Sequence, residues 1–245
     1  MPAAALALVF APAGSRAGVI TIAVSGNQGG DALSAQAVFT TSAGFVDIKL
    51  TNTLTPSQII GAGSLISDLS FTLSNAPGTL NLGSASATGT EGNLGNNGNV
   101  LSSFPGLPIL RWLGLGVPPP GGTGTPVNIS GNTVTLNVLG GGMPFDMILP
   151  DGTSFPNANA SVIGFNPSVL GTLDIILPLS GVTANTTVTS ATFSFGTGPD
   201  HFLTGSPGPL PIPEPATIAL VLSGLGSFGV AGLRRLRRQP ADVTA

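Results

Sequence analysis

Five short segments of the chain alternate apolar and polar residues with a period of two. They are residues 45–50, 68–73, 133–138, 172–177 and 190–195. Successive side chains of a β-strand point to opposite faces of the sheet, so this alternation predicts strands with one buried face. Segments 18–24, 36–41 and 161–165 predict further strands, and no long stretch of the body has a convincing helical period. The sequence therefore predicts an all-β fold, an antiparallel β-sandwich or a jelly-roll-like arrangement.

The middle of the chain, residues 83–126, interrupts this pattern with glycine and proline. GTEGNLGNNGN predicts a flexible loop, and VPPPGGTGTP combines a stiff proline run with flexible glycines. Between them lies FPGLPILRWLGLG, which contains the only tryptophan, Trp112. This apolar stretch either packs over the sandwich or is exposed, and the rarity of large exposed apolar patches favours packing. We interpret 83–126 as an insertion within one body, residues 18–206, and not as a domain boundary.

The chain is unusually poor in charge. Charged residues make up 7% of it, against roughly 25% in an ordinary soluble domain, so serine, threonine, asparagine and glycine must build the polar surface. Residues 19–212 hold eight acids and two bases, and such an acidic body would repel phosphate backbones, so nucleic acid is not an expected partner. The absence of cysteine excludes disulfides, thiolate metal sites and a cysteine nucleophile.

The first residues have the pattern of an export signal. Residues 3–13 are apolar but too few to span a bilayer as a helix. Small residues at Ser15 and Ala17 then predict cleavage between Ala17 and Gly18, so residues 1–17 are expected to be a signal peptide. No lysine or arginine precedes the apolar run, which suggests that translation starts a few codons upstream. The alternative is a buried N-terminal strand or helix.

The last residues have a three-part pattern. Residues 207–215 are rich in proline, residues 216–233 carry no charge, and residues 234–245 begin with Arg234, Arg235, Arg237 and Arg238. Eighteen residues of helix extend roughly 27 Å, about one hydrocarbon core, so 216–233 predicts a transmembrane helix. The arginines predict a cytoplasmic tail, which places the body on the outer side of the inner membrane.

This ending resembles the PEP-CTERM sorting signal of Gram-negative bacteria. Pro213, Glu214 and Pro215 match the motif, and the apolar span and the basic cluster follow in the expected order, so that the signal covers about 211–239. The resemblance implies recognition by an exosortase, a membrane enzyme thought to cleave near the motif and to transfer or release the body. The alternative is a rigid linker to a permanent anchor, which would need the same residues.

Residues typical of catalytic or binding sites occur only in isolation. Gly224–Gly229 has the spacing GxGxxG, but a dinucleotide site needs a further strand and an acid about 20 positions on, and a short basic tail follows instead. His201, the only histidine, lies in the turn-rich GTGPDHFLTG and is expected to be a solvated turn residue. Asp151 in PDGTSFPN suits a calcium ion or an Asp-Gly turn, and the turn is the simpler interpretation. We expect no catalytic residue, no metal site and no cofactor.

Three functions remain as hypotheses. The first is an exported, non-catalytic protein of the cell surface or extracellular matrix. The second is a carbohydrate-binding β-sandwich module with exopolysaccharide as partner, although the chain has no tyrosine, one tryptophan and 12 phenylalanines, and phenylalanine lacks the polar group that suits wet binding faces. The third is a secreted hydrolase, for which the sequence offers no constellation of residues.

Overall fold

The computed structural model describes residues 18–115, 125–139, 145–198 and 201–208. These residues lie in one compact unit and form an all-β structure, which confirms the predicted fold class. Among them no helix is long and apolar enough to cross a bilayer. The predicted transmembrane helix, 216–233, lies outside the described residues.

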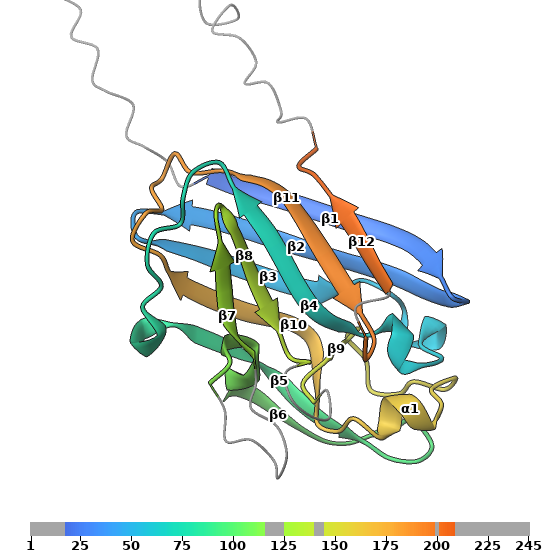
Figure 1. Cartoon of the computed structure of the whole chain (residues 1–245). Coiled ribbons are helices and arrows are strands. Elements are labelled where there is room, and N and C mark those ends of the chain that lie inside the picture. The colour runs from blue at the N-terminus through green and yellow to red at the C-terminus, as the bar shows by residue number, and fades with distance from the viewer. Residues whose placement is uncertain (1–17, 116–124, 140–144, 199–200, 209–245) are drawn as a thin grey trace, which may run out of the picture. The chain divides into compact units, whose positions relative to one another are not determined.

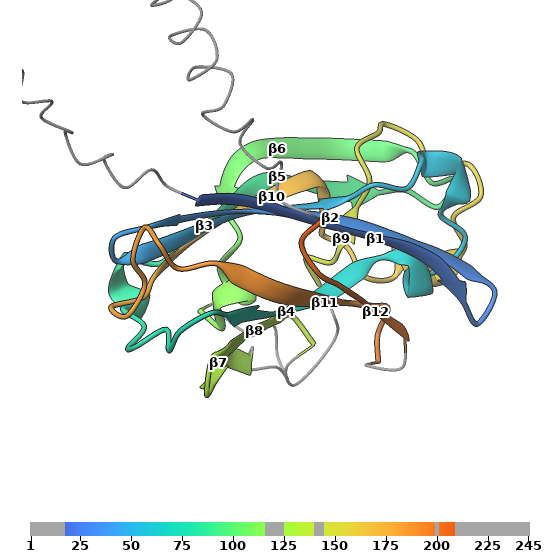
Figure 2. The same cartoon turned by 90° about the horizontal axis from the view of Figure 1, so that it is seen from above.

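The strands stack in two layers that face each other (Figure 2). One layer has the order β1-β2-β3-β10-β5-β6 and the other β12-β11-β4-β8-β7. The first layer comprises β1 (Gly18–Gln28), β2 (Asp31–Ser42), β3 (Phe45–Asn52), β10 (Ser168–Pro178), β5 (Ser86–Leu94) and β6 (Val100–Pro108). The second comprises β12 (His201–Gly205), β11 (Val188–Phe195), β4 (Ile66–Leu73), β8 (Thr133–Asn137) and β7 (Thr125–Ser130). These pairings are antiparallel, so most backbone polar groups are satisfied within each layer.

A two-residue strand, β9 (Ile148–Leu149), joins the two layers. It pairs with β10 in parallel and with β4 in the antiparallel sense, so the hydrogen-bonded path runs from one layer into the other. The remaining elements are short: η1 (Pro56–Gln58), η2 (Ala62–Ser64), η3 (Leu82–Ser84), η4 (Leu110–Leu113) and α1 (Ala160–Ile163). Two of these, η2 and α1, contribute to the hollow described below.

The alternation seen in the sequence corresponds to buried and exposed faces. All five predicted strands form, and the apolar set of each is buried: Val46, Ile48, Leu50; Leu69, Phe71, Leu73; Val134, Leu136, Val138; Leu173, Ile175, Leu177; and Ala191, Phe193, Phe195. The rings of Phe39 and Phe71, one from each layer, lie 5.2 Å apart between centroids and tie the layers together. Segments 18–24 and 36–41 also lie in strands, β1 and β2.

The strand predicted at 161–165 is wrong, because this segment begins within the single helical turn α1. The Asn159 side chain caps the turn by accepting a hydrogen bond from the Ser161 backbone N–H at 2.8 Å. A capping asparagine directly ahead of the helical turn therefore outweighs the strand preference of valine, isoleucine and phenylalanine.

The loop predicted for GTEGNLGNNGN is confirmed at residues 95–99, which connect β5 to β6, and is wrong at residues 89–94, which belong to β5 near the edge of the first layer. Its glycines serve close packing. A β-carbon at Gly92 would lie 2.5 Å from Leu170 Cδ1, and one at Gly89 would lie 3.2 Å from Val169 Cγ1. Side chains of β10 thus cover the glycines of β5, which is one of the places where glycine is tolerated inside a strand.

The predicted packing of the FPGLPILRWLGLG stretch is confirmed at Trp112. This residue lies in η4 and is fully buried, and its indole N–H donates to the Asp146 carbonyl at 2.9 Å. Arg111 Nε lies 3.0 Å from Asp146 Oδ2. Burial, with Glu91 nearby, raises the pKa of Asp146 to about 7, and Arg111 opposes this rise. The two neighbouring side chains of η4 therefore connect this stretch to the segment before β9 at one aspartate.

Asp68, on β4 in the second layer, is a partly buried acid without a positively charged cross-strand neighbour. Burial raises the pKa of Asp68 on β4 from its ordinary value of 3.8 to about 7. Its cross-strand neighbours, Asn137 on β8 and Ser194 on β11, carry no charge. The folded chain therefore holds this proton more tightly than the unfolded chain does.

We expect Asp68→Asn to change how stability depends on pH. The stabilising effect of protonated Asp68 is fully present below about pH 4 and is lost as the pH rises to about 7, because the unfolded carboxyl ionises first. Relative to wild type, the variant should therefore gain on the order of 2–4 kcal/mol of unfolding free energy between pH 4 and pH 8. Thermal unfolding of the full chain across this range measures the gain. Asp151→Asn, at an exposed position, is the control, and equal pH profiles for wild type and Asp68→Asn would contradict the expectation.

Candidate functional site

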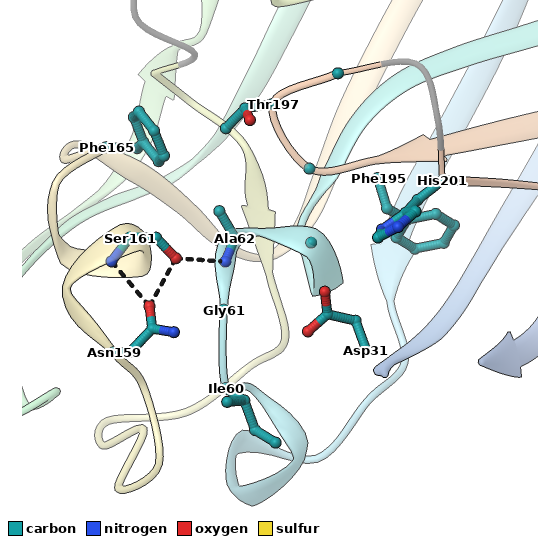
Figure 3. Close-up of a pocket in the computed structure, with 13 residues that line it drawn as sticks. Asp31, Ile60, Gly61, Ala62, Asn159, Ser161, Phe165, Phe195, Thr197 and His201 are labelled. Carbon is teal, nitrogen blue, oxygen red and sulfur yellow. Dashed lines mark hydrogen bonds between the residues drawn. The ribbon is translucent and has the colours of Figure 1, made fainter. Parts of the chain in front are cut away.

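A hollow of about 410 Å³ lies where four separate segments of the body meet (Figure 3). Asp31 comes from the start of β2, and residues 60–63 in and beside η2 form a second part of the lining. Residues in and beside α1 form a third part, and residues 195–198 with His201 form the fourth. The lining residues are Asp31, Ile60, Gly61, Ala62, Gly63, Asn159, Ser161, Phe165, Phe195, Gly196, Thr197, Gly198 and His201. No group of three or more histidine, cysteine, aspartate or glutamate side chains is placed to hold a metal ion within the described ranges.

The Asp31 carboxylate and the His201 imidazole reach the same glycine, Gly63. A β-carbon at Gly63 would overlap Asp31 Oδ2 and would stand 3.3 Å from His201 Nδ1. On its other side the histidine ring meets Gly29, whose β-carbon would lie 2.7 Å from His201 Nε2. Gly29 also has a φ of +60°, a conformation that glycine adopts at no steric cost. Glycine at these two positions therefore lets the two side chains lie against the backbone.

Asn159 and Ser161 form the opposite side of the hollow. Asn159 Oδ1 accepts from the Ser161 backbone N–H at 2.8 Å and from the Ser161 hydroxyl at 2.6 Å (Figure 3). Ser161 Oγ in turn accepts from the Ala62 backbone N–H at 3.0 Å, which connects α1 to η2. The oxygen of the Asn159 amide is thus fully used, whereas its NH₂ group, 3.5 Å from the position of a β-carbon on Gly61, remains a donor toward the hollow.

Asp31 and His201 have no partner in the described part of the chain. Neither the carboxylate nor the imidazole forms a hydrogen bond or ion pair there. The two described lysine and arginine side chains are paired elsewhere, Lys49 with Asp174 at 2.7 Å and Arg111 with Asp146. The hollow therefore presents an unpaired acceptor and an unpaired imidazole without a neighbouring lysine or arginine.

This arrangement differs from what the sequence predicts for His201. The residue begins β12 and is half-buried against the hollow, so the prediction of a solvated turn residue is wrong. The Ser161 hydroxyl donates to Asn159, and no hydrogen bond joins it to His201 in the part of the chain that the structure describes. Asp151 is exposed in the bend after β9, and the structure brings no other described acid into a metal-binding group with it.

The predicted sorting and cleavage residues lie almost wholly outside the described residues. These are Ala17, Pro213, Glu214, Pro215, Arg234, Arg235, Arg237 and Arg238. Gly18, the residue after the predicted cleavage site, is the first residue of β1 and pairs with Thr41 on β2. The predicted signal peptide therefore precedes the first strand directly in the sequence.

Comparison with protein families gives one match, to the PEP-CTERM protein-sorting motif, over residues 211–238. The chain carries a PEP-CTERM sorting domain. The sorting domain contains Pro213-Glu214-Pro215, the apolar span and the four arginines, and it ends one residue before the predicted limit at 239. The searches of curated proteins and of solved structures found no match to this chain.

The PEP-CTERM domain connects the chain to an exosortase. A sorting signal of this kind implies an exported, membrane-associated precursor that the exosortase processes for delivery to the cell surface. The match covers the last part of the chain only, so it carries no information about the role of the β body.

Proposed function

We propose that this protein is a non-catalytic component of the cell surface or extracellular matrix, exported through its N-terminal signal and sorted by an exosortase. The observation that carries the proposal is the PEP-CTERM domain at 211–238, directly after a compact β unit that ends at 208 in the described residues. In this proposal the two-layered body is a β-sandwich that is displayed outside, and residues 216–233 span the inner membrane only in the precursor.

The character of the body supports a structural or binding role over a hydrolase. His201 forms no hydrogen bond with a serine among the described residues, and the two acids whose pKa values are raised to about 7, Asp68 and Asp146, lie on different segments, β4 and the stretch before β9. A polar hollow with unpaired groups is a feature of binding sites as much as of enzymes. A surface with little charge, built from serine, threonine and asparagine, suits contact with neutral matrix material such as exopolysaccharide.

Mass spectrometry of the surface-exposed protein tests this proposal. We expect the form recovered from the surface of the parental strain to begin at Gly18 and to lack residues 216–245, because both signals have been removed. In a strain without the exosortase, the chain should begin at Gly18 and keep its C-terminal segment in the membrane fraction. Recovery of an intact Met1 at the surface would contradict export by a cleaved signal, and an identical C-terminus in both strains would contradict exosortase processing.

A further inference from the structure

We propose that the hollow bounded by Asp31, Asn159, Phe165, Thr197 and His201 binds one neutral sugar unit of a surface polysaccharide. The inference rests on the proposed function, which places the body outside the cell, and it assigns a ligand class and a site to that body. The argument depends on the polar groups of the hollow, its charge, its apolar wall and its access from solvent.

The polar groups of the hollow complement hydroxyl groups. The Asp31 carboxylate is an acceptor without a partner among the described residues, and the Asn159 NH₂ group is a free donor because its carbonyl oxygen is occupied by Ser161. The Thr197 hydroxyl both donates and accepts, and the two ring nitrogens of His201 add further hydrogen-bonding positions. A sugar hydroxyl is itself donor and acceptor, so neighbouring hydroxyls of one ring can satisfy these groups at once.

The charge of the hollow selects against anions. No lysine or arginine lines it, and both such side chains of the described body are engaged with Asp174 and Asp146. A phosphate, sulfate or uronate group would meet the Asp31 carboxylate without a lysine or arginine side chain to compensate its charge. The favoured ligand is therefore neutral and hydroxylated.

An apolar wall completes the site. Phe165 stands at one side of the hollow and Ile60, which is 52% exposed, at another (Figure 3). The ring of Phe195, which also lines the hollow, is buried. Ligand sites combine such apolar surface with a few convergent polar groups, and the hollow falls in the size range of about 300–1,000 Å³ seen for them.

The hollow is accessible to a polymer. Asn159, Ser161 and Thr197 on its border are all exposed, so a residue within a chain can enter from solvent while its neighbours remain outside. The walls come from four segments held by the β layers and by the Ser161–Ala62 hydrogen bond, so the site is formed before the ligand binds.

Binding of defined polysaccharides to the purified full chain tests the proposal. The chain is kept in a detergent without sugar groups, and the probes are dextran, mannan and galactan as neutral polymers and alginate as an anionic one. We expect saturable binding of at least one neutral polymer and none of alginate. Asp31→Asn should weaken that binding roughly tenfold or more, because it removes the charged acceptor.

Two further variants separate binding from folding. Thr197 is exposed and lies outside the hydrophobic core, so Thr197→Val should leave the melting temperature unchanged. It should weaken binding severalfold, because the hydroxyl group is lost. Asp151→Asn removes one negative charge from an exposed bend outside the hollow and should bind as wild type does. Failure of every neutral polymer to bind, or equal binding by wild type, Asp31→Asn and Thr197→Val, would overturn the proposal.

Thermal unfolding in the presence of metal ions tests the competing possibility that the hollow binds a divalent cation. Asp31 and His201 are also ligands that a divalent cation accepts. A rise in melting temperature with zinc or calcium ions alone, lost in Asp31→Asn and unaccompanied by polysaccharide binding, would make the hollow a cation site and the sugar proposal wrong. These measurements use purified protein, so their outcome is independent of sorting, and the surface mass spectrometry above fails or succeeds separately.

Discussion

The Glu214→Ala chain should accumulate as a longer, membrane-bound precursor, with the processed surface form reduced by about tenfold or more. An enzyme site built to bind a charged or polar group rejects a substrate that lacks it, because the polar groups of the site are then left unpaired. Glu214 is the one charged residue of the Pro-Glu-Pro motif, and it is four residues into the 211–238 match. The apolar span and its arginines are unchanged in this variant, so membrane insertion should be normal.

Two comparisons make this result specific to the motif. Asp242→Ala removes an acid outside the matched residues and should be processed as wild type is. Neutral replacement of Arg234, Arg235, Arg237 and Arg238 should instead disturb membrane retention and orientation, since these charges hold the end of the helix in the cytoplasm. An immunoblot of membrane and released fractions reads all of these variants. One band of the same size in the membrane fraction for wild type, Glu214→Ala and a strain without the exosortase would establish a permanent anchor instead.

The strands that could be predicted from sequence are those in which apolar and polar side chains alternate, so that the pattern itself shows which face is buried. In segment 45–50, the apolar residues alternate with Asp47 and Lys49, so the sequence itself marks the buried face. β5 offers no such mark, because only two of its nine positions, Ala87 and Leu94, carry an apolar side chain. It forms because β10 provides both backbone partners and the side chains that cover its glycines, which are tertiary effects.

The hollow could not be predicted for a related reason. Asp31 and His201 are far apart in sequence, and each is the first residue of a strand, a position that by itself does not indicate a site. They meet because β1 and β12 lie at the same side of the two layers and because Gly29 and Gly63 leave room for the ring and the carboxylate. The glycines of GNQGGD and GAGS were visible in the sequence, but their role depends on which side chains approach them.

Of the substitutions proposed for the body, replacement of Trp112 in η4 should cause the largest loss of stability. Trp112→Ala should lower the free energy of unfolding by about 3–5 kcal/mol, because it leaves a cavity where a fully buried ring packs. A domain has roughly 5–15 kcal/mol in total, so this variant should be close to unfolding at moderate temperature. Thermal unfolding of the full chain, followed by far-ultraviolet circular dichroism because the tryptophan itself is removed, measures the loss.

A conservative variant divides that loss into its parts. Trp112→Phe keeps an aromatic ring but leaves the Asp146 carbonyl without the indole N–H, and should therefore cost about 1–3 kcal/mol, less than the alanine variant. Phe202→Ala on β12, at a side chain 51% exposed, is the matched control and should change stability by about 0.5 kcal/mol or less. If Trp112→Ala melted at the temperature of Phe202→Ala, η4 would unfold separately from the rest of the two β layers, as a cooperative unit of its own.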